Sequence, residues 1–146
     1  MIAGRKNLSI FSGSEEQTVA FGKELASLLK NGDVVSLTGP LGAGKTCLIR
    51  GIALGLGIDN DDIKSPSFTL VNEYYGALPL FHIDLYRVKE PSEFYEIGLD
   101  DYLMRDGVVA VEWGEKAEGA LPKNRIQINI GIVSEFGRNL KINFVE

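Results

Sequence analysis

The sequence predicts an α/β fold, in which helices flank a mixed β-sheet and produce a three-layer arrangement. Early in the chain, segments with helical spacing alternate with short β-branched runs, which favours parallel pairing of strands. Late in the chain, two consecutive segments alternate apolar and polar residues, which favours antiparallel pairing. Both kinds of pairing in one chain predict a mixed sheet with helices packed on it.

The composition predicts one globular domain over residues 1–146. Apolar residues make up 45% of the chain and charged residues 24%, which excludes a disordered or collagen-like protein. We find no internal repeat, no low-complexity tract and no linker rich in proline and serine that would mark a domain boundary. The whole chain is therefore expected to fold together.

The charge and hydropathy patterns limit the partners and the location. The net charge is −5 and the fifteen Lys and Arg residues are scattered, so strong binding to nucleic acid would need a partner protein. No apolar run approaches the roughly 20 residues that cross a bilayer, and the N-terminus lacks the apolar core of a secretory signal. We expect a cytoplasmic protein with no role at a membrane. The single cysteine, Cys47, is expected to be a small buried side chain.

The first elements are a strand and a capped helix. Residues 6–11 have the pattern of a strand. Ser14 followed three residues later by Gln17 resembles a capping box, which predicts that a helix begins there and covers residues 15–30. The Asn-Gly pair at 31–32 is expected to end this helix.

A strand, a tight loop and a second helix are predicted next. Residues 33–39 form a β-branched run that is too short for a helix. The segment after Gly44 has helical spacing, with its apolar residues on one face. That face consists of Leu48, Ile49, Ile52, Ala53 and Leu56.

The middle of the chain predicts a hairpin followed by a broken helix. Residues 68–75 and 78–86 read as strands on either side of Gly76, so they are expected to pair through a short turn. Residues 91–107 have helical spacing that is interrupted at Gly98.

Three further strands complete the predicted sheet. Residues 108–113 look like a buried strand because the run is short, apolar and rich in valine. Residues 125–133 and 139–145 alternate apolar and polar side chains and are expected to pair with each other in antiparallel fashion.

The most specific motif is a glycine-rich loop between the second predicted strand and the second predicted helix. Gly39, four further residues, Gly44, Lys45 and Thr46 match the phosphate-binding pattern G-x-x-x-x-G-K-[ST]. Glycines let the loop curl so that its N–H groups point at phosphate oxygens, and the helix adds its positive N-terminal end. A glycine-rich turn without a ligand is the structural alternative. The context favours a P-loop NTPase-like fold that binds a nucleoside triphosphate.

The P-loop residues have distinct expected roles. Lys45 would neutralise charge on the β- and γ-phosphates, and the Thr46 hydroxyl would be a ligand of the Mg²⁺ that accompanies the nucleotide. The expected nucleotide-binding residues of this loop are Gly39, Leu41, Gly42, Ala43, Gly44, Lys45, Thr46 and Cys47.

Two acidic residues could serve the metal ion. Asp84 and Glu112 each stand at the end of a predicted buried strand, where P-loop proteins place an acid near Mg²⁺. Spacing alone does not decide between them, and a solvated strand end is the alternative for each.

Other candidates surround this core set. The hydroxyl-rich loop at 63–70 could hold a group that senses the γ-phosphate, with Ser65, Ser67 and Thr69 as candidates, although it could also be a simple turn. His82, on an apolar strand, is more typical of a structural histidine than of a ligand. Trp113 could stack on a base or pack in the core.

Several motifs together resemble the TsaE (YjeE) family, small P-loop ATPases required for the threonylcarbamoyladenosine modification of bacterial tRNA. The resemblance rests on the segments GPLGAGKT, SPSFTL, HIDLYR, EIGLDDYL, VEW and LPKNRIQI, in the family's order over about residues 10–130. It implies an ATPase that uses ATP and Mg²⁺, releases ADP, and works with the proteins TsaB and TsaD. Contact with tRNA would then be indirect, through that complex.

The resemblance also implies roles for individual residues. Lys45, Asp84 and Glu112 would be catalytic, and Thr46, Glu112 and Asp84 would serve the metal ion. Trp113 would stack on adenine, and a switch loop would contain Ser67 and Thr69. The departures from the family pattern are Pro40, Cys47, Ser67 and Gly114.

Other functions are compatible with a P-loop. A small-molecule kinase normally has an arginine-rich lid, but the arginines here are dispersed. A GTPase would need D-x-x-G and N-K-x-D motifs, which the sequence lacks. A module that senses a nucleotide and hydrolyses it only incidentally is the remaining alternative.

Overall fold

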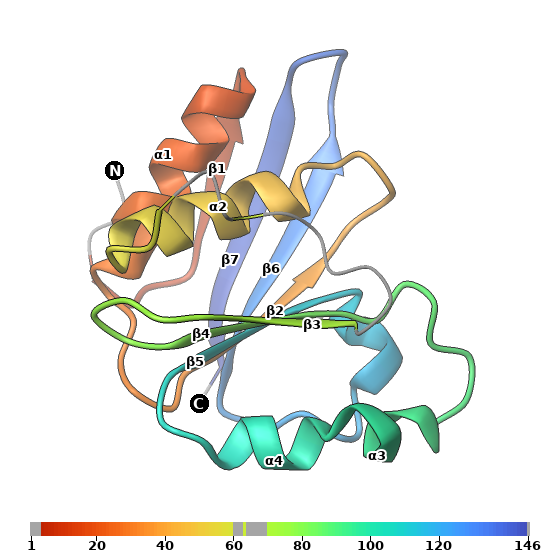
Figure 1. Ribbon diagram of the computed structural model, residues 1–146. Helices are drawn as coiled ribbons and strands as arrows, with labels where there is room; N and C mark the ends of the chain where they lie inside the picture. The colour runs from red at the N-terminus through yellow and green to blue at the C-terminus, as the bar shows by residue number, and fades with distance from the viewer. Residues whose placement is uncertain (1–3, 60–62, 64–69, 146) are drawn as a thin grey trace.

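The computed structural model describes residues 4–59, 63 and 70–145. Its centre is a seven-stranded sheet with the strand order β1-β7-β6-β2-β5-β4-β3 (Figure 1). The elements are β1 (Leu8–Ser12), α1 (Glu15–Ala26), β2 (Val34–Thr38), α2 (Lys45–Gly55), β3 (Val71–Tyr74), β4 (Leu80–Asp84), α3 (Glu93–Ile97), α4 (Leu99–Met104), β5 (Val108–Glu112), the 3₁₀ helix η2 (Gly114–Ala117), β6 (Arg125–Ile132) and β7 (Arg138–Val145).

The sheet is mixed, as the sequence predicts. Strand β2 lies at the middle and pairs in parallel with both β5 and β6, and β4 pairs in parallel with β5. The two predicted antiparallel pairs are also present, β3 with β4 and β6 with β7. Strand β1 joins β7 at the edge. The carboxyl ends of β2, β4 and β5 therefore lie along one edge of the sheet.

Helices cover the two faces of the sheet and create the predicted three layers. Helices α1 and α2 lie on one face, and α3 and α4 lie on the other (Figure 1). The larger apolar cluster joins α1 and α2 to strand residues such as Leu37 and Ile128. The smaller cluster lies under α3, α4 and η2 and includes Val109 and Val111. Alternate residues of the central strands are buried on opposite faces, because both faces are covered.

Helix α1 begins as predicted but ends earlier. The Ser14 hydroxyl oxygen accepts a hydrogen bond from the Gln17 N–H at 3.1 Å, which caps the helix. The helix ends at Ala26, so the predicted end near residue 30 is wrong. The Ser27 hydroxyl donates to the Glu24 carbonyl oxygen, and the next residues bond three residues back instead of four. A serine that bonds backbone in this way competes with the α-helical pattern, which explains the earlier end.

The contact between α1 and α2 depends on glycine. A Cβ atom at Gly22 would lie 2.3 Å from the Leu48 carbonyl oxygen, and one at Gly51 would lie 2.1 Å from the Val19 carbonyl oxygen. Both distances are too short for any side chain. The two helices therefore meet main chain against main chain, which fixes α1 against the helix that begins at the P-loop.

Two glycine predictions of the sequence analysis are confirmed. Gly76 lies in the short connection between β3 and β4. Gly98 separates α3 from α4 and has a φ of +74°, a left-handed conformation that favours glycine. The helical segment at 91–107 is therefore broken where the sequence indicates.

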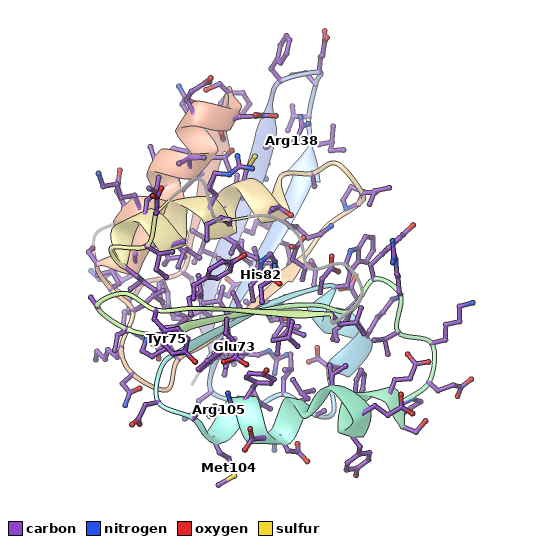
Figure 2. The ribbon with its side chains drawn as sticks, in the orientation of Figure 1. Glu73, Tyr75, His82, Met104, Arg105 and Arg138 are labelled. Carbon is purple, nitrogen blue, oxygen red and sulfur yellow. The ribbon has the colours of Figure 1, made fainter. Side chains whose placement is uncertain are left out.

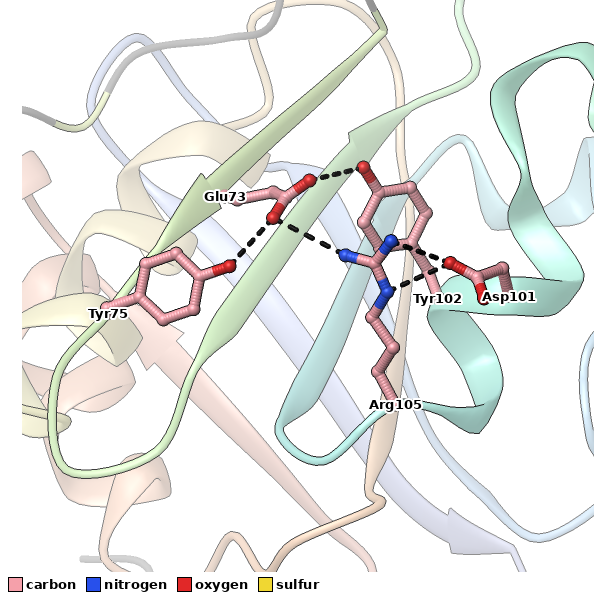
Figure 3. A network of polar contacts seen from close by, with 5 residues as sticks. All are labelled: Glu73, Tyr75, Asp101, Tyr102 and Arg105. Carbon is pink, nitrogen blue, oxygen red and sulfur yellow. Dashed lines mark hydrogen bonds and ion pairs between the residues drawn. The ribbon is translucent and has the colours of Figure 1, made fainter.

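A polar network ties the edge strand β3 to α4 (Figure 3). The Glu73 carboxylate accepts hydrogen bonds from the Tyr75 hydroxyl at 2.8 Å, the Tyr102 hydroxyl at 2.6 Å and the Arg105 guanidinium at 3.4 Å. Arg105 also pairs with Asp101 at 2.7 Å. These five residues lie on the α3–α4 side of the sheet, away from the P-loop.

Candidate functional site

The P-loop connects β2 to α2, so the middle of the sheet presents it. Helix α2 begins at Lys45, directly after Gly44, which has a φ of +103°. Gly39 has a φ of +151°, and a Cβ atom there would lie 2.5 Å from the Ile130 carbonyl oxygen. Only glycine fits at Gly39, because the loop passes directly against β6. The motif thus requires its glycines for backbone reasons that the structure shows.

Lys45 is buried, with 4% of its surface exposed. Its ammonium group donates to the carbonyl oxygens of Gly39 at 2.5 Å and Pro40 at 3.1 Å. Burial lowers the pKa of Lys45, and the nearby carboxylates of Glu112, Glu115 and Asp84 oppose that effect. A cation in this position, held by its own loop, is suited to meet an anion that approaches the P-loop.

Glu112 is a buried carboxylate at the end of β5, with 4% of its surface exposed. Its Oε2 accepts from the Thr46 hydroxyl at 3.1 Å and lies 2.5 Å from Nε2 of His82. A carboxylate is costly to bury without donors, and the Thr46 hydroxyl provides one. Of the two acids that the sequence leaves open, Glu112 is the one that contacts Thr46.

Asp84 lies next to Glu112 in the sheet, because the register pairs these two residues across β4 and β5. Its Oδ1 accepts a hydrogen bond from the Tyr86 N–H at 3.0 Å. Burial raises the pKa of Asp84, and the Glu112 charge adds to this effect. Both acids therefore stand at the same edge of the sheet, close to the start of α2.

Trp113 follows Glu112 in a left-handed conformation with a φ of +60°. This conformation is rare for a bulky residue and is typical of strained positions at functional sites. The Lys45 ammonium lies 4.0 Å from the centre of the indole ring. The centres of the Tyr86 and Trp113 rings are 5.1 Å apart. The indole also packs against the smaller apolar cluster, so packing contributes to its position. Its stacking on adenine stays a prediction.

One cleft of about 280 Å³ collects almost all the predicted nucleotide-binding residues. It adds Glu15 and Tyr86, which the sequence analysis does not include, while Gly39 is absent from its lining. Cys47 is partly exposed here, so the expectation of a buried side chain is wrong. The cleft is lined by Glu15, Leu41, Gly42, Ala43, Gly44, Lys45, Thr46, Cys47, Asp84, Tyr86, Glu112 and Trp113.

Arg138, at the start of β7, contacts the P-loop, and the sequence analysis does not identify it (Figure 2). Its Nε donates to the Ala43 carbonyl oxygen at 3.1 Å, and a terminal nitrogen donates to the Gly42 carbonyl oxygen at 3.2 Å. The other terminal nitrogen donates to carbonyl oxygens in the turn between β6 and β7. Arg138 therefore joins the P-loop to that turn, although it lies 95 positions after Ala43 in the sequence.

Three further findings concern features that the sequence analysis considers. The switch-loop candidates Ser65, Ser67 and Thr69 lie outside the described residues. Within the described ranges, no group of three or more His, Cys, Asp and Glu residues is arranged to hold a metal ion by itself. No helix in that part of the chain is long and apolar enough to cross a membrane.

Comparison with known proteins identifies the family. Residues 12–140 match the model of a family described as "Threonylcarbamoyl adenosine biosynthesis protein TsaE". The chain belongs to the TsaE family. The matched range includes the P-loop, both acidic strand ends and Arg138, so the family match spans the whole candidate site.

Individual relatives agree with the family match. The chain is 39% identical to the tRNA threonylcarbamoyladenosine biosynthesis protein TsaE of Treponema pallidum, covering 90% of this chain and 96% of that one. It is 45% identical to the TsaE protein of Bacillus subtilis, covering 86% and 78%. The crystal structure of Bacillus subtilis YdiB superposes with a TM-score of 0.80 at 39% identity, covering 97% of this chain and 87% of that one. These TsaE relatives support the α/β P-loop fold.

Proposed function

We propose that this TsaE-family protein is a Mg²⁺-dependent ATPase of the bacterial machinery that makes threonylcarbamoyladenosine in tRNA. The observation that carries the proposal is the joint position of Lys45, Thr46 and Glu112. A buried cation and a hydroxyl stand at the start of α2, and the hydroxyl contacts a buried carboxylate at 3.1 Å. P-loop enzymes use this combination for phosphates and a metal ion.

The residues present fit a bound Mg²⁺–ATP complex. Mg²⁺ that arrives with a nucleotide is usually bound by one or two carboxylates together with phosphates and water. Thr46 and Glu112 would hold the ion, with Asp84 beside them, and the N–H groups of the P-loop would hold the phosphates. When bound, Mg²⁺ would offset the negative charge of the phosphates.

Each side chain then has a defined task. Lys45 would exchange its carbonyl partners, Gly39 and Pro40, for phosphate oxygens, because a charged acceptor binds an ammonium group more strongly than a carbonyl does. Glu112 and Asp84 would orient water in the cleft, and Trp113 and Tyr86 would exclude bulk water from it. Trp113 is also the proposed contact for adenine.

The proposed partners are TsaB and TsaD, with tRNA reached through their complex in the cytoplasm. The family description supports a place in this pathway, since it names threonylcarbamoyl adenosine biosynthesis. The net charge of −5 also supports a division of labour in which another subunit holds the RNA.

Measuring phosphate release tests the proposal. The purified chain would be assayed with ATP and Mg²⁺, alone and together with TsaB, TsaD and tRNA, with chelation of Mg²⁺ as the control. We expect Mg²⁺-dependent release of phosphate that the partners increase. Nucleotide binding without release under any combination would favour the sensing module, and a phosphorylated small molecule would favour a kinase. No binding of adenine nucleotide would reject the proposal.

A further inference from the structure

We propose that His82 is a positioning residue that holds Glu112 in place by donating its Nε2–H to the carboxylate. His82 is fully buried, and its Nε2 lies 2.5 Å from Oε2 of Glu112. The sequence pattern favours a structural histidine on an apolar strand, but the structure gives its ring a contact with the candidate site. The proposal deepens the ATPase function and rests on it for its kinetic test only.

The sheet geometry explains why these two side chains meet. In the parallel pair β4–β5, His82 is opposite Ala110, and Asp84 is opposite Glu112. Residues two apart on a strand share a face, so His82 and Glu112 are diagonal neighbours on the same face. Ala110 is small, which leaves room for the imidazole ring to reach past it to Glu112.

The donor arrangement points to a positioning role. Glu112 accepts from Thr46 and lies within bonding distance of His82, and both contacts involve Oε2. Under the proposed function, the Thr46 hydroxyl would also serve the metal ion through an oxygen lone pair, so its position would be shared between Glu112 and the bound nucleotide. His82 is the neighbour of Glu112 with no part in nucleotide binding, because it lies inside the sheet and not in the P-loop. Holding a flexible glutamate side chain in one rotamer costs conformational entropy, and the hydrogen bond from His82 would offset that cost.

The other ring nitrogen supports one tautomer. Nδ1 of His82 is buried, and no described residue forms a hydrogen bond with it. An unpaired buried N–H is rarer in proteins than an unpaired acceptor, so the lone pair belongs on Nδ1 and the proton on Nε2. This tautomer is the one that can donate to Glu112.

Nitrogen NMR of the nucleotide-free protein tests the contact directly. His82 is the only histidine in the chain, so its two ring-nitrogen signals need no assignment by mutation. We expect one signal from a protonated Nε2 and one from an unprotonated Nδ1. A proton on Nδ1 with none on Nε2, or averaged signals from two exchanging tautomers, would overturn the proposal. The result does not depend on ATP hydrolysis.

Two variants test the consequence for catalysis. In His82→Gln the amide can still donate to Glu112, whereas His82→Leu removes the donor and keeps an apolar side chain in an apolar strand. We expect His82→Leu to lower kcat about tenfold or more with KM for ATP changed less than about twofold, and His82→Gln to keep kcat within about threefold.

The comparison of the two variants separates positioning from a general structural role. Thermal unfolding of both variants would be measured beside the kinetics. Equal kcat in His82→Leu and the unsubstituted protein, or equal losses in both variants, would contradict the proposal. If the unsubstituted protein itself does not hydrolyse ATP, the ATPase function fails, while the NMR result still decides whether His82 holds Glu112.

Discussion

Glu112 and Glu73 are two glutamates on strands of the same sheet, and their surroundings differ. Glu112 stands on the inner strand β5 and is almost fully buried, with Thr46 and His82 beside its carboxylate. Glu73 stands on the edge strand β3, with 35% of its side chain exposed, and accepts from two tyrosines and Arg105 (Figure 3). Glu73 has more donors, but Glu112 is far more enclosed.

The comparison shows that the burial of a carboxylate, and not the number of its hydrogen bonds, indicates where its charge can act strongly on a ligand. Water screens the Glu73 network, so its hydrogen bonds and ion pairs each add little to stability. Inside the cleft of Glu112, a charge acts at short range with little screening. We therefore expect substitutions around Glu112 to change function strongly and substitutions around Glu73 to change stability mildly.

The largest effect is expected from Lys45→Ala. The substitution removes the buried cation of the cleft, so affinity for Mg²⁺–ATP should fall by roughly a thousandfold, or about 4 kcal/mol. Isothermal titration calorimetry measures this, with circular dichroism to show that the fold is retained. Affinity within about threefold of the original value would show that Lys45 does not bind phosphate.

The next largest effect is expected from Glu112→Gln. The amide keeps the shape but removes the negative charge, so hydrolysis should fall roughly a hundredfold while ATP binding changes less. Glu73→Gln is the matched control on the exposed side of the comparison and should leave hydrolysis unchanged. Similar rates for both variants would remove the functional difference between the two glutamates.

The third prediction concerns Tyr102→Phe, which should change how the free energy of unfolding depends on pH. Burial, followed by the hydrogen bond to Glu73, raises the pKa of Tyr102 from 10.0 to about 12. A raised folded-state pKa stabilises the protein below the unfolded value, and this contribution is lost as pH rises from about 10 to about 12. Urea unfolding should show Tyr102→Phe to be less stable by about 1 kcal/mol near neutral pH, with a smaller difference above about pH 11. A pH-independent difference would contradict the assignment.

The smallest effect is expected from Arg105→Met. The Arg105 side chain is 41% exposed, and its partner Asp101 is more exposed still. Methionine keeps an apolar stem over the Tyr102 ring, so the change in unfolding free energy should be about 0.5 kcal/mol or less and should shrink further in high salt. A loss above about 2 kcal/mol would show that this network is not screened as we describe.

Much of the fold follows from local pattern. Short valine-rich and alternating runs predict every strand that the described residues form, and the broken helix at Gly98 follows from one glycine in a helical pattern. The end of α1 is the exception, because the competing hydrogen bond of Ser27 is not visible in spacing. Strand order is also not visible, because it depends on which hydrophobic faces meet.

The candidate site was predicted where its residues are close in sequence. The P-loop motif brings Lys45 and Thr46 together, and strand ends suggest Asp84 and Glu112 without deciding between them. Two contacts needed the sheet itself: His82 reaches Glu112 only through the register of β4 and β5, and Arg138 reaches the P-loop only because β7 lies beside β6. A histidine two residues before a strand-end acid is the sequence signal that could have drawn attention to His82.

The close contact between α1 and α2 at Gly22 and Gly51 has a mechanical consequence. With Gly22 and Gly51 in main-chain contact, no layer of side chains separates the two helices at this point. A shift of the α2 N-terminus would therefore press directly on α1, whose first residue, Glu15, lines the cleft.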